Sequence, residues 1–302
     1  MADILLPRYP IYVISKGRSD CCLTARFLVR DEVPFRLVVE PQERELYARE
    51  FGEGRILVLP FGNLGQGSIP ARNFVKDHST EEGHERHWII DDNILGMWRR
   101  WKARKIRCAA APAYRVVEDF VDRYENVAIA GHNYYMFAPN KLRMPPFFLN
   151  VHVYSSILLS NLIPHRWRGR DNEDTDLCLQ VLSAGYCTVL MNAFLAWKMT
   201  TMTMKGGNSA ELYQGDGRLK MARSLERAWP GVVGVERRFR RPQHVVKDAW
   251  RRFDTPLKRK PGVDFAGLPD VDEFGMELEQ KKETKSPELR ALISSARIPP
   301  RL

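Results

Sequence analysis

Two adjacent carboxylates end an apolar run, and their side chains could bind a divalent cation. Ile89 and Ile90 lead directly into Asp91 and Asp92, and Asn93 follows. A continuous apolar run is typical of a buried strand, where a carboxylate is not expected unless it is paired or bound to a cation. At the carboxyl end of a strand, such hard oxygen ligands would suit a metal ion and a substrate phosphate. Alternatively, the strand ends in a turn, and Asp92 and Asn93 cap a following helix.

A second acidic cluster, at the start of a predicted helix, could supply a general base. Glu173, Asp174 and Asp176 open this helix, shortly after a basic turn at residues 168–170. Acids near a helix N-terminus are stabilised by the helix dipole, so a capping role alone would explain them. A carboxylate beside a bound electrophile can instead take the proton of an attacking hydroxyl. A metal on one element and a base on another are what glycosyl transfer from a nucleoside diphosphate sugar requires.

Basic side chains in three turns or helix starts could bind a diphosphate. The sequence Ser-Lys-Gly-Arg at 15–18 follows the first predicted strand, and Arg72 and Asn73 lie one turn into a predicted helix. Lys205, beside two glycines, could close over a ligand, and His244 could be a third metal ligand. Each of these residues also fits an ordinary surface or loop role. The glycine-rich loop before Arg72 is neither a Walker A motif nor a dinucleotide fingerprint.

The elements that would position these groups alternate between strand and helix. Short connections between such elements favour an α/β fold with a parallel or mostly parallel sheet. The expected strands are residues 11–15, 35–39, 56–59, 87–91, 127–131, 151–159 and 188–191. The expected helices are residues 19–30, 43–51, 69–78, 113–124 and 177–184.

Composition indicates a globular protein with a polyanionic partner. The 302 residues are 44% hydrophobic, and the net charge is +10. No apolar run reaches membrane-spanning length and no signal-peptide pattern is present, so we expect a soluble intracellular protein without a membrane partner. Five cysteines without a CxxC pair indicate reduced thiols rather than zinc or disulfides.

Composition also divides the chain into three parts. Residues 1–208 carry the alternating elements, residues 209–260 are basic, and residues 261–302 are polar and weakly periodic. We expect a transferase-like domain, a basic extension that contacts DNA, and a partly disordered tail.

Four motifs, taken in order, resemble those of a known family. They are Ser-Lys-Gly-Arg at 15–18, Ala-Arg-Asn at 71–73, Trp-Ile-Ile-Asp-Asp-Asn at 88–93 and Asn-Glu-Asp-Thr-Asp-Leu at 172–177. Over residues 9–208 this order and spacing resemble the TET-associated glycosyltransferases encoded by bacteriophages. The resemblance implies a GT-A-like, Rossmann-like fold. Its sheet would be mixed and mostly parallel, flanked by helices, and followed here by a basic helical C-terminal extension.

The resemblance implies a metal-dependent hexosyltransferase that uses a nucleotide sugar, expected to be UDP-linked, with Mn²⁺ or Mg²⁺. Its acceptor would be a 5-hydroxymethylpyrimidine, expected to be 5-hydroxymethylcytosine, in double-stranded phage DNA. The enzyme would act beside a TET-type dioxygenase in the cytoplasm of an infected bacterial host. The target base would have to leave the stack, and Tyr134, Tyr135, Phe147 and Phe148 could stack on it or form core.

The resemblance and the residue types together give a predicted site. The predicted donor contacts are Ser15, Lys16, Arg18, Glu40, Arg72, Asn73, Asp91 and Lys205. The predicted metal ligands are Asp91, Asp92, Asn93 and His244, with Asn93 in place of the usual third aspartate of a DxD motif. The predicted catalytic pair is Asp174, as the base, with Glu173. Two alternatives are a GT-A transferase with a protein, lipid or saccharide acceptor, and a catalytically inactive nucleic-acid-binding protein.

Overall fold

The structure is a computed structural model of the whole chain. It describes residues 5–102, 104–140, 144–169, 172–199, 206, 217–238 and 241–277. The predicted donor contact Lys205 lies outside the described residues. The alternation of strands and helices is confirmed, and the fold is α/β, consistent with a GT-A-like fold.

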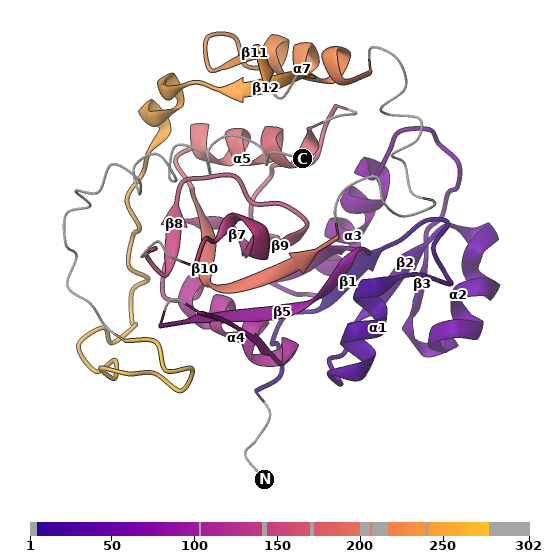
Figure 1. The fold of residues 1–302 in the computed structure, drawn as a ribbon, viewed down its shortest axis with the longest axis horizontal. Helices are drawn as coiled ribbons and strands as arrows, with labels where there is room; N and C mark the ends of the chain where they lie inside the picture. The colour runs from indigo at the N-terminus through magenta and orange to yellow at the C-terminus, as the bar shows by residue number, and fades with distance from the viewer. Residues whose placement is uncertain are drawn as a thin grey trace.

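A ten-stranded mixed sheet forms the centre of the molecule (Figure 1). The strand order is β3-β2-β1-β4-β9-β7-β10-β5-β6, and β8 pairs with β10. Most strands run in one direction, while β5, β8 and β9 run in the other. The strands are β1 (Ile11–Ile14), β2 (Arg36–Val39), β3 (Ile56–Val58), β4 (Arg86–Asp91), β5 (Ile94–Trp101), β6 (Arg104–Cys108), β7 (Val127–Tyr134), β8 (Phe147–Leu149), β9 (Ser156–Ser160) and β10 (Cys187–Lys198).

Helices cover both faces of the sheet, because successive residues of each strand point to opposite faces. One core cluster joins Val13 of β1 to α1, α2 and α4. The other joins Tyr12, the preceding residue, to α3, α5 and α7. The helices are α1 (Leu23–Arg30), α2 (Arg44–Phe51), α3 (Ile69–Glu81), α4 (Ala110–Val121), α5 (Glu173–Ser183) and α7 (Gly217–Ala228).

The segment after Asn93 differs from one sequence interpretation. The alternative in which Asp92 and Asn93 cap a helix is wrong, because β5 follows them and forms a hairpin with β6. Strand 151–159 is also shorter than expected, since β9 begins only at Ser156.

The basic extension is only partly helical. After α7 the chain forms an antiparallel hairpin of β11 (Val233–Arg238) and β12 (Arg241–Val246), in which His244 pairs with Val235. This hairpin packs with α7 and lies next to α5 in Figure 1. The expectation of a helical extension therefore holds for α7 but not for the hairpin. In the expected tail, Phe274 is buried in the core.

Two of the four candidate stacking aromatics are buried, and a third packs against the core. Phe148 and Tyr134 are buried, and the Phe147 ring packs 4.6 Å from that of Phe120. All five cysteines are free thiols, as predicted. Among the described residues, no helix has the length and apolar character needed to cross a membrane.

Candidate active site

The first acidic cluster lies where β1 and β4 end side by side. These strands are parallel, and Ile14 pairs with Asp91, so Ser15 and Asp92 follow at the same edge. The Ser15 hydroxyl donates to Asp92 Oδ2 (2.8 Å), and Arg18 Nη1 donates to Asp92 Oδ1 (2.5 Å). Burial raises the pKa of Asp92, and the charge of Arg18 opposes this rise. The turn at residues 15–18 therefore binds the carboxylate that follows β4.

Asp91 contacts a different set of groups. Its Oδ1 accepts from Arg72 Nη2 (3.0 Å), and its Oδ2 accepts from Lys198 Nζ (2.9 Å) and from Ser155 Oγ (2.5 Å). Burial opposes ionisation of Asp91, but the charges of Lys198 and Arg72 outweigh it and hold its pKa well below the usual range. Asp91 is therefore ionised at any pH at which the protein would work.

Lys198 is a site residue that sequence reasoning missed. It is the last residue of β10, and its Nζ lies 3.5 Å from the Tyr134 hydroxyl and 5.5 Å from the centre of the Tyr134 ring. Burial lowers the pKa of Lys198, but the charge of Asp91 outweighs burial, and the pKa is raised. A lysine that ends a long apolar strand was the available signal in the sequence.

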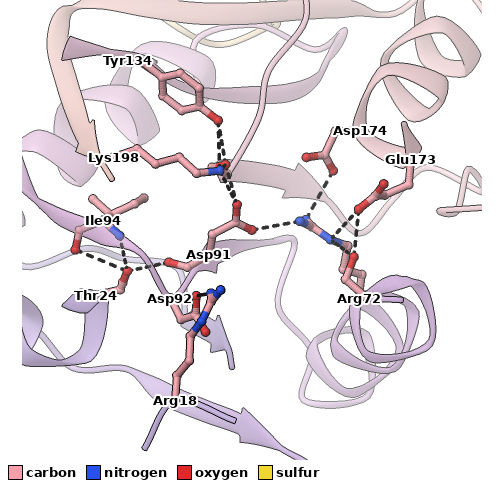
Figure 2. A network of polar contacts seen from close by, with 12 residues as sticks. Arg18, Thr24, Arg72, Asp91, Asp92, Ile94, Tyr134, Glu173, Asp174 and Lys198 are labelled. Atoms are coloured by element: carbon pink, nitrogen blue, oxygen red, sulfur yellow. Dashed lines mark hydrogen bonds and ion pairs between the residues drawn. The ribbon is translucent and has the colours of Figure 1, made fainter. Parts of the chain in front are cut away.

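Arg72 joins the two acidic clusters (Figure 2). Pro70 is the second residue of α3, so Arg72 lies in the first turn of this helix, where its side chain is only 5% exposed. Arg72 Nη1 lies 3.4 Å from Asp174 Oδ1, and Arg72 Nε lies 3.9 Å from Glu173 Oε1. One guanidinium thus faces three carboxylates from β4 and α5.

Asp174 has the pKa that a general base needs. Its Oδ1 accepts the Trp167 indole N–H (3.1 Å). Burial raises the pKa of Asp174 to about 6, Arg72 opposes this rise, and the charges of Glu173 and Asp91 add to it. Such a carboxylate is mostly ionised at neutral pH and can still accept a proton.

Asp176, third in the same cluster, has a structural role instead. Its carboxylate accepts from Arg168 Nε (2.8 Å) and from the Trp229 indole N–H (2.7 Å). It thereby ties α5 to the end of α7.

A cavity of about 230 Å³ lies between the turn at residues 15–18 and the start of α3. Lys16 and Glu40 line it together with Asn63, and Lys16 Nζ lies 2.8 Å from Glu40 and 3.2 Å from Asn63 Oδ1. The start of α3 forms another part of its wall. Two predicted donor contacts therefore lie together at one cavity, next to the helix that carries Arg72.

Two other predicted residues have different surroundings. The Asn73 side chain donates to the Trp167 carbonyl (2.8 Å) and accepts from its backbone N–H (3.1 Å). Asn73 therefore positions the segment that carries Trp167. His244 is buried in the β11–β12 hairpin, where burial lowers its pKa to about 4. Within the described part of the chain, no hydrogen bond joins His244 to Asp91 or Asp92.

A comparison with protein families decides the family of this chain. A family model described as TET-Associated Glycosyltransferase matches residues 9–207, which include both acidic clusters. The chain belongs to the TET-associated glycosyltransferases. A comparison with curated proteins finds no match.

This TET-associated glycosyltransferase is weakly similar to a solved structure of another protein. The chain is similar to mannose-6-phosphate isomerase from Helicobacter pylori with 8% sequence identity and a TM-score of 0.28. That match covers 84% of this chain and 94% of the isomerase chain.

The acidic centre of this TET-associated glycosyltransferase contains two adjacent carboxylates, Asp91 and Asp92, at the end of β4. Among the described residues, no group of three or more His, Cys, Asp or Glu side chains could hold a metal ion. Mg²⁺-type ions are often bound by one or two carboxylates together with substrate phosphates. The Asn93 side-chain oxygen, next to Asp92, is buried and has no hydrogen-bond partner in the described part of the chain. Hard oxygen ligands for a cation are therefore present.

Proposed function

We propose that this glycosyltransferase moves a sugar from a UDP-sugar to 5-hydroxymethylcytosine in double-stranded phage DNA. The observation that carries the proposal is the Arg72 guanidinium, which lies between Asp91 and Asp174. Asp91 is suited to a cation that binds the donor diphosphate, and Asp174 is suited to deprotonate an acceptor. Arg72 contacts both and so holds them near each other. Sugar transfer needs both groups at one reacting carbon.

The donor side of the proposal rests on the cavity and the cations beside it. The nucleoside would occupy the cavity lined by Lys16 and Glu40, and the diphosphate would lie against Arg18, Arg72 and Lys198. Cations held in place before the substrate arrives stabilise the charge that develops on a leaving diphosphate.

Charge balance supports a divalent cation as a further part of the proposal. In the described network, Asp91, Asp92, Glu173 and Asp174 outnumber the cations Arg18, Arg72 and Lys198. The site therefore has no surplus positive charge with which to bind a diphosphate. Asp91 and Asp92 would hold Mn²⁺ or Mg²⁺, which supplies that charge when bound.

The acceptor side rests on Asp174. The hydroxymethyl oxygen attacks the anomeric carbon of the sugar, and its proton passes to the Asp174 carboxylate. The bond from that carbon to the diphosphate oxygen breaks, and UDP leaves with the bonding electrons. This direct displacement inverts the configuration of the anomeric carbon. The net charge of +10 suits DNA as the acceptor. In an infected cell, a TET-type dioxygenase would supply the hydroxymethyl group.

A transfer assay tests the proposal. The full chain is incubated with a panel of nucleotide sugars, Mn²⁺ and duplex DNA that contains either 5-hydroxymethylcytosine or cytosine, and nucleosides are then analysed by mass spectrometry. A hexose added only to the hydroxymethylated nucleoside supports the proposal. Donor hydrolysis without transfer to DNA would favour a different acceptor, and neither hydrolysis nor transfer would favour an inactive binding protein.

A further inference from the structure

The β5–β6 hairpin is strongly basic, and none of the predicted site residues lies on it. Between Asp92 and Glu118 the chain contains no acidic residue. The hairpin itself carries Arg99, Arg100, Lys102, Arg104, Lys105 and Arg107. β6 is an edge strand of the sheet, because it pairs only with β5 in the described strand order.

Pairing between the strands places three of these cations on one face. Trp98 pairs with Arg107, and Arg100 pairs with Lys105. Paired residues project to the same side of a sheet, as do residues two apart along a strand. Arg100 and Lys105 are thus like charges directly opposite each other. Arg100 Nη2 donates to the Pro139 carbonyl (3.3 Å), and Lys105 Nζ donates to the Tyr135 carbonyl (2.6 Å). In the described part of the chain, neither Lys105 nor Arg107 forms an ion pair.

Aromatic side chains lie beside these cations. The Trp98 ring centre lies 5.0 Å from that of Tyr135 and 5.8 Å from that of Trp197. Lys105 Nζ lies 3.8 Å from the Tyr135 ring centre. Trp197 is 43% exposed, although it is a large apolar residue. We call Trp98, Arg100, Lys105, Arg107, Tyr135 and Trp197 the hairpin patch.

The hairpin patch adjoins the acidic centre along two chain segments. Trp197 precedes Lys198, which contacts Asp91, and Tyr135 follows Tyr134, whose hydroxyl lies 3.5 Å from Lys198 Nζ. Figure 1 shows β5 running along β10, the strand that carries both Trp197 and Lys198. A nucleic-acid strand bound to the hairpin patch would therefore lie next to the acidic centre.

We infer that the hairpin patch binds the DNA segment next to the modified base. Phosphates would lie on Arg100, Lys105 and Arg107, and an unstacked base would lie on Trp197. Proteins bind single nucleic-acid strands with cations that contact the phosphates and aromatic rings that stack on the bases. The hairpin patch has both kinds of side chain. Charged residues on an edge strand also prevent aggregation, but that role needs no exposed tryptophan beside them. This inference rests on DNA being the acceptor, as proposed above.

The test replaces Arg100, Lys105 and Arg107 with glutamine in the full chain. Binding to a 20-base-pair duplex containing one 5-hydroxymethylcytosine is measured by fluorescence anisotropy at several salt concentrations. If all three cations contact phosphates, the slope of log K against log salt should become shallower by about 2.7, at about 0.9 per contact. The matched control replaces Arg26, Arg30 and Arg44 on α1 and α2, which are exposed and paired with acids, and it should keep the wild-type slope.

A second variant tests the stacking role separately. Trp197→Ala should weaken DNA binding roughly 5- to 100-fold, as expected for loss of one base–aromatic stack, whereas Trp197→Phe should retain most of the affinity. UDP binding, measured by calorimetry on every variant, should be unchanged and shows that the variants are folded.

The outcomes separate this inference from the proposed function. If the wild type glycosylates DNA and the triple variant keeps its salt slope, the patch inference is wrong and the function stands. If the wild type binds no DNA but sediments with phosphatidylserine vesicles, and the triple variant does not, the surface binds a membrane and the inference is overturned. If the wild type binds DNA through the patch but transfers no sugar, the inference holds and the proposed function fails.

Discussion

Replacing Asp174 with asparagine tests whether this carboxylate activates the acceptor. Asparagine keeps the size of the side chain and can still accept the Trp167 indole N–H, which lies 3.1 Å from Asp174. It cannot take a proton. A positioned general base contributes roughly 10²- to 10⁴-fold, so transfer at saturating donor and DNA should fall by about that factor. The affinity for DNA should change by no more than about twofold, because the substitution removes an interaction of the transition state. The affinity for UDP should not fall, because loss of the Asp174 charge leaves Arg72 more available to the diphosphate.

The pKa of Asp174 sets the expected pH dependence. The carboxylate must be ionised to act as a base, and its pKa is about 6. The ionised fraction is about 90% at pH 7 and about 10% at pH 5. At donor and DNA concentrations well below saturation, where the rate reports the free enzyme, the wild-type rate should therefore rise about tenfold from pH 5 to pH 7 and level off above pH 7. The Asp174→Asn rate should lack this rise.

The assay is sugar transfer to hydroxymethylated duplex DNA from pH 5 to 8, measured by nucleoside mass spectrometry. Glu173→Gln is the matched control. The charge of Glu173 raises the pKa of Asp174. This substitution should therefore move the rise in rate with pH (the acidic limb of the profile) to lower pH and leave the maximal rate unchanged. If Asp174→Asn keeps the wild-type rate and the wild-type acidic limb, Asp174 is not the general base. Loss of transfer in Glu173→Gln alone would identify Glu173 as the base.

Three further predictions concern the groups around the two aspartates. Lys198→Met leaves Asp91 with Arg72 as its one remaining cation in the described network and should lower the free energy of unfolding by about 3 kcal/mol in urea titrations at pH 7. Because the native pKa of Asp91 is depressed, this difference should narrow as the pH falls below about 4. Arg72→Lys should shift the acidic limb of transfer to higher pH, since one ammonium cannot approach all three carboxylates and Asp174 loses opposing charge. Asp92→Ala should weaken UDP binding in Mn²⁺ by at least about tenfold in calorimetry, and equal affinity would show that Asp92 holds no metal.

The sequence predicted the residues of the acidic centre that follow clear element boundaries. Asp91 ends an apolar strand, Arg72 follows a proline-started helix turn, and Asp174 opens a helix with a regular apolar face. Each boundary can be identified from neighbouring residues, and the parallel β1–β4 pairing then brings the turn at residues 15–18 to Asp92. Local patterns were therefore enough for these positions.

The parts that could not be predicted depend on contacts between distant segments. Lys198 meets Asp91 from 107 positions away, so its place at the end of an apolar strand does not show which carboxylate it contacts. β5 and β6 carry so many charges that their strand alternation is hidden, because the cations lie on both faces of an edge hairpin. Asn73 has the position of a ligand-binding residue, yet its amide is used by the Trp167 backbone.

Sharing one guanidinium among three carboxylates links the two substrates thermodynamically. A donor diphosphate that draws Arg72 toward itself leaves Asp174 with less opposing charge, and its own negative charge acts in the same direction. The proton affinity of Asp174 therefore rises when the donor is bound. By reciprocity, protonation of Asp174 favours donor binding to the same degree. In such a site, the basicity of Asp174 is higher when the donor site is occupied. An acceptor that binds before the donor would therefore face a weaker base.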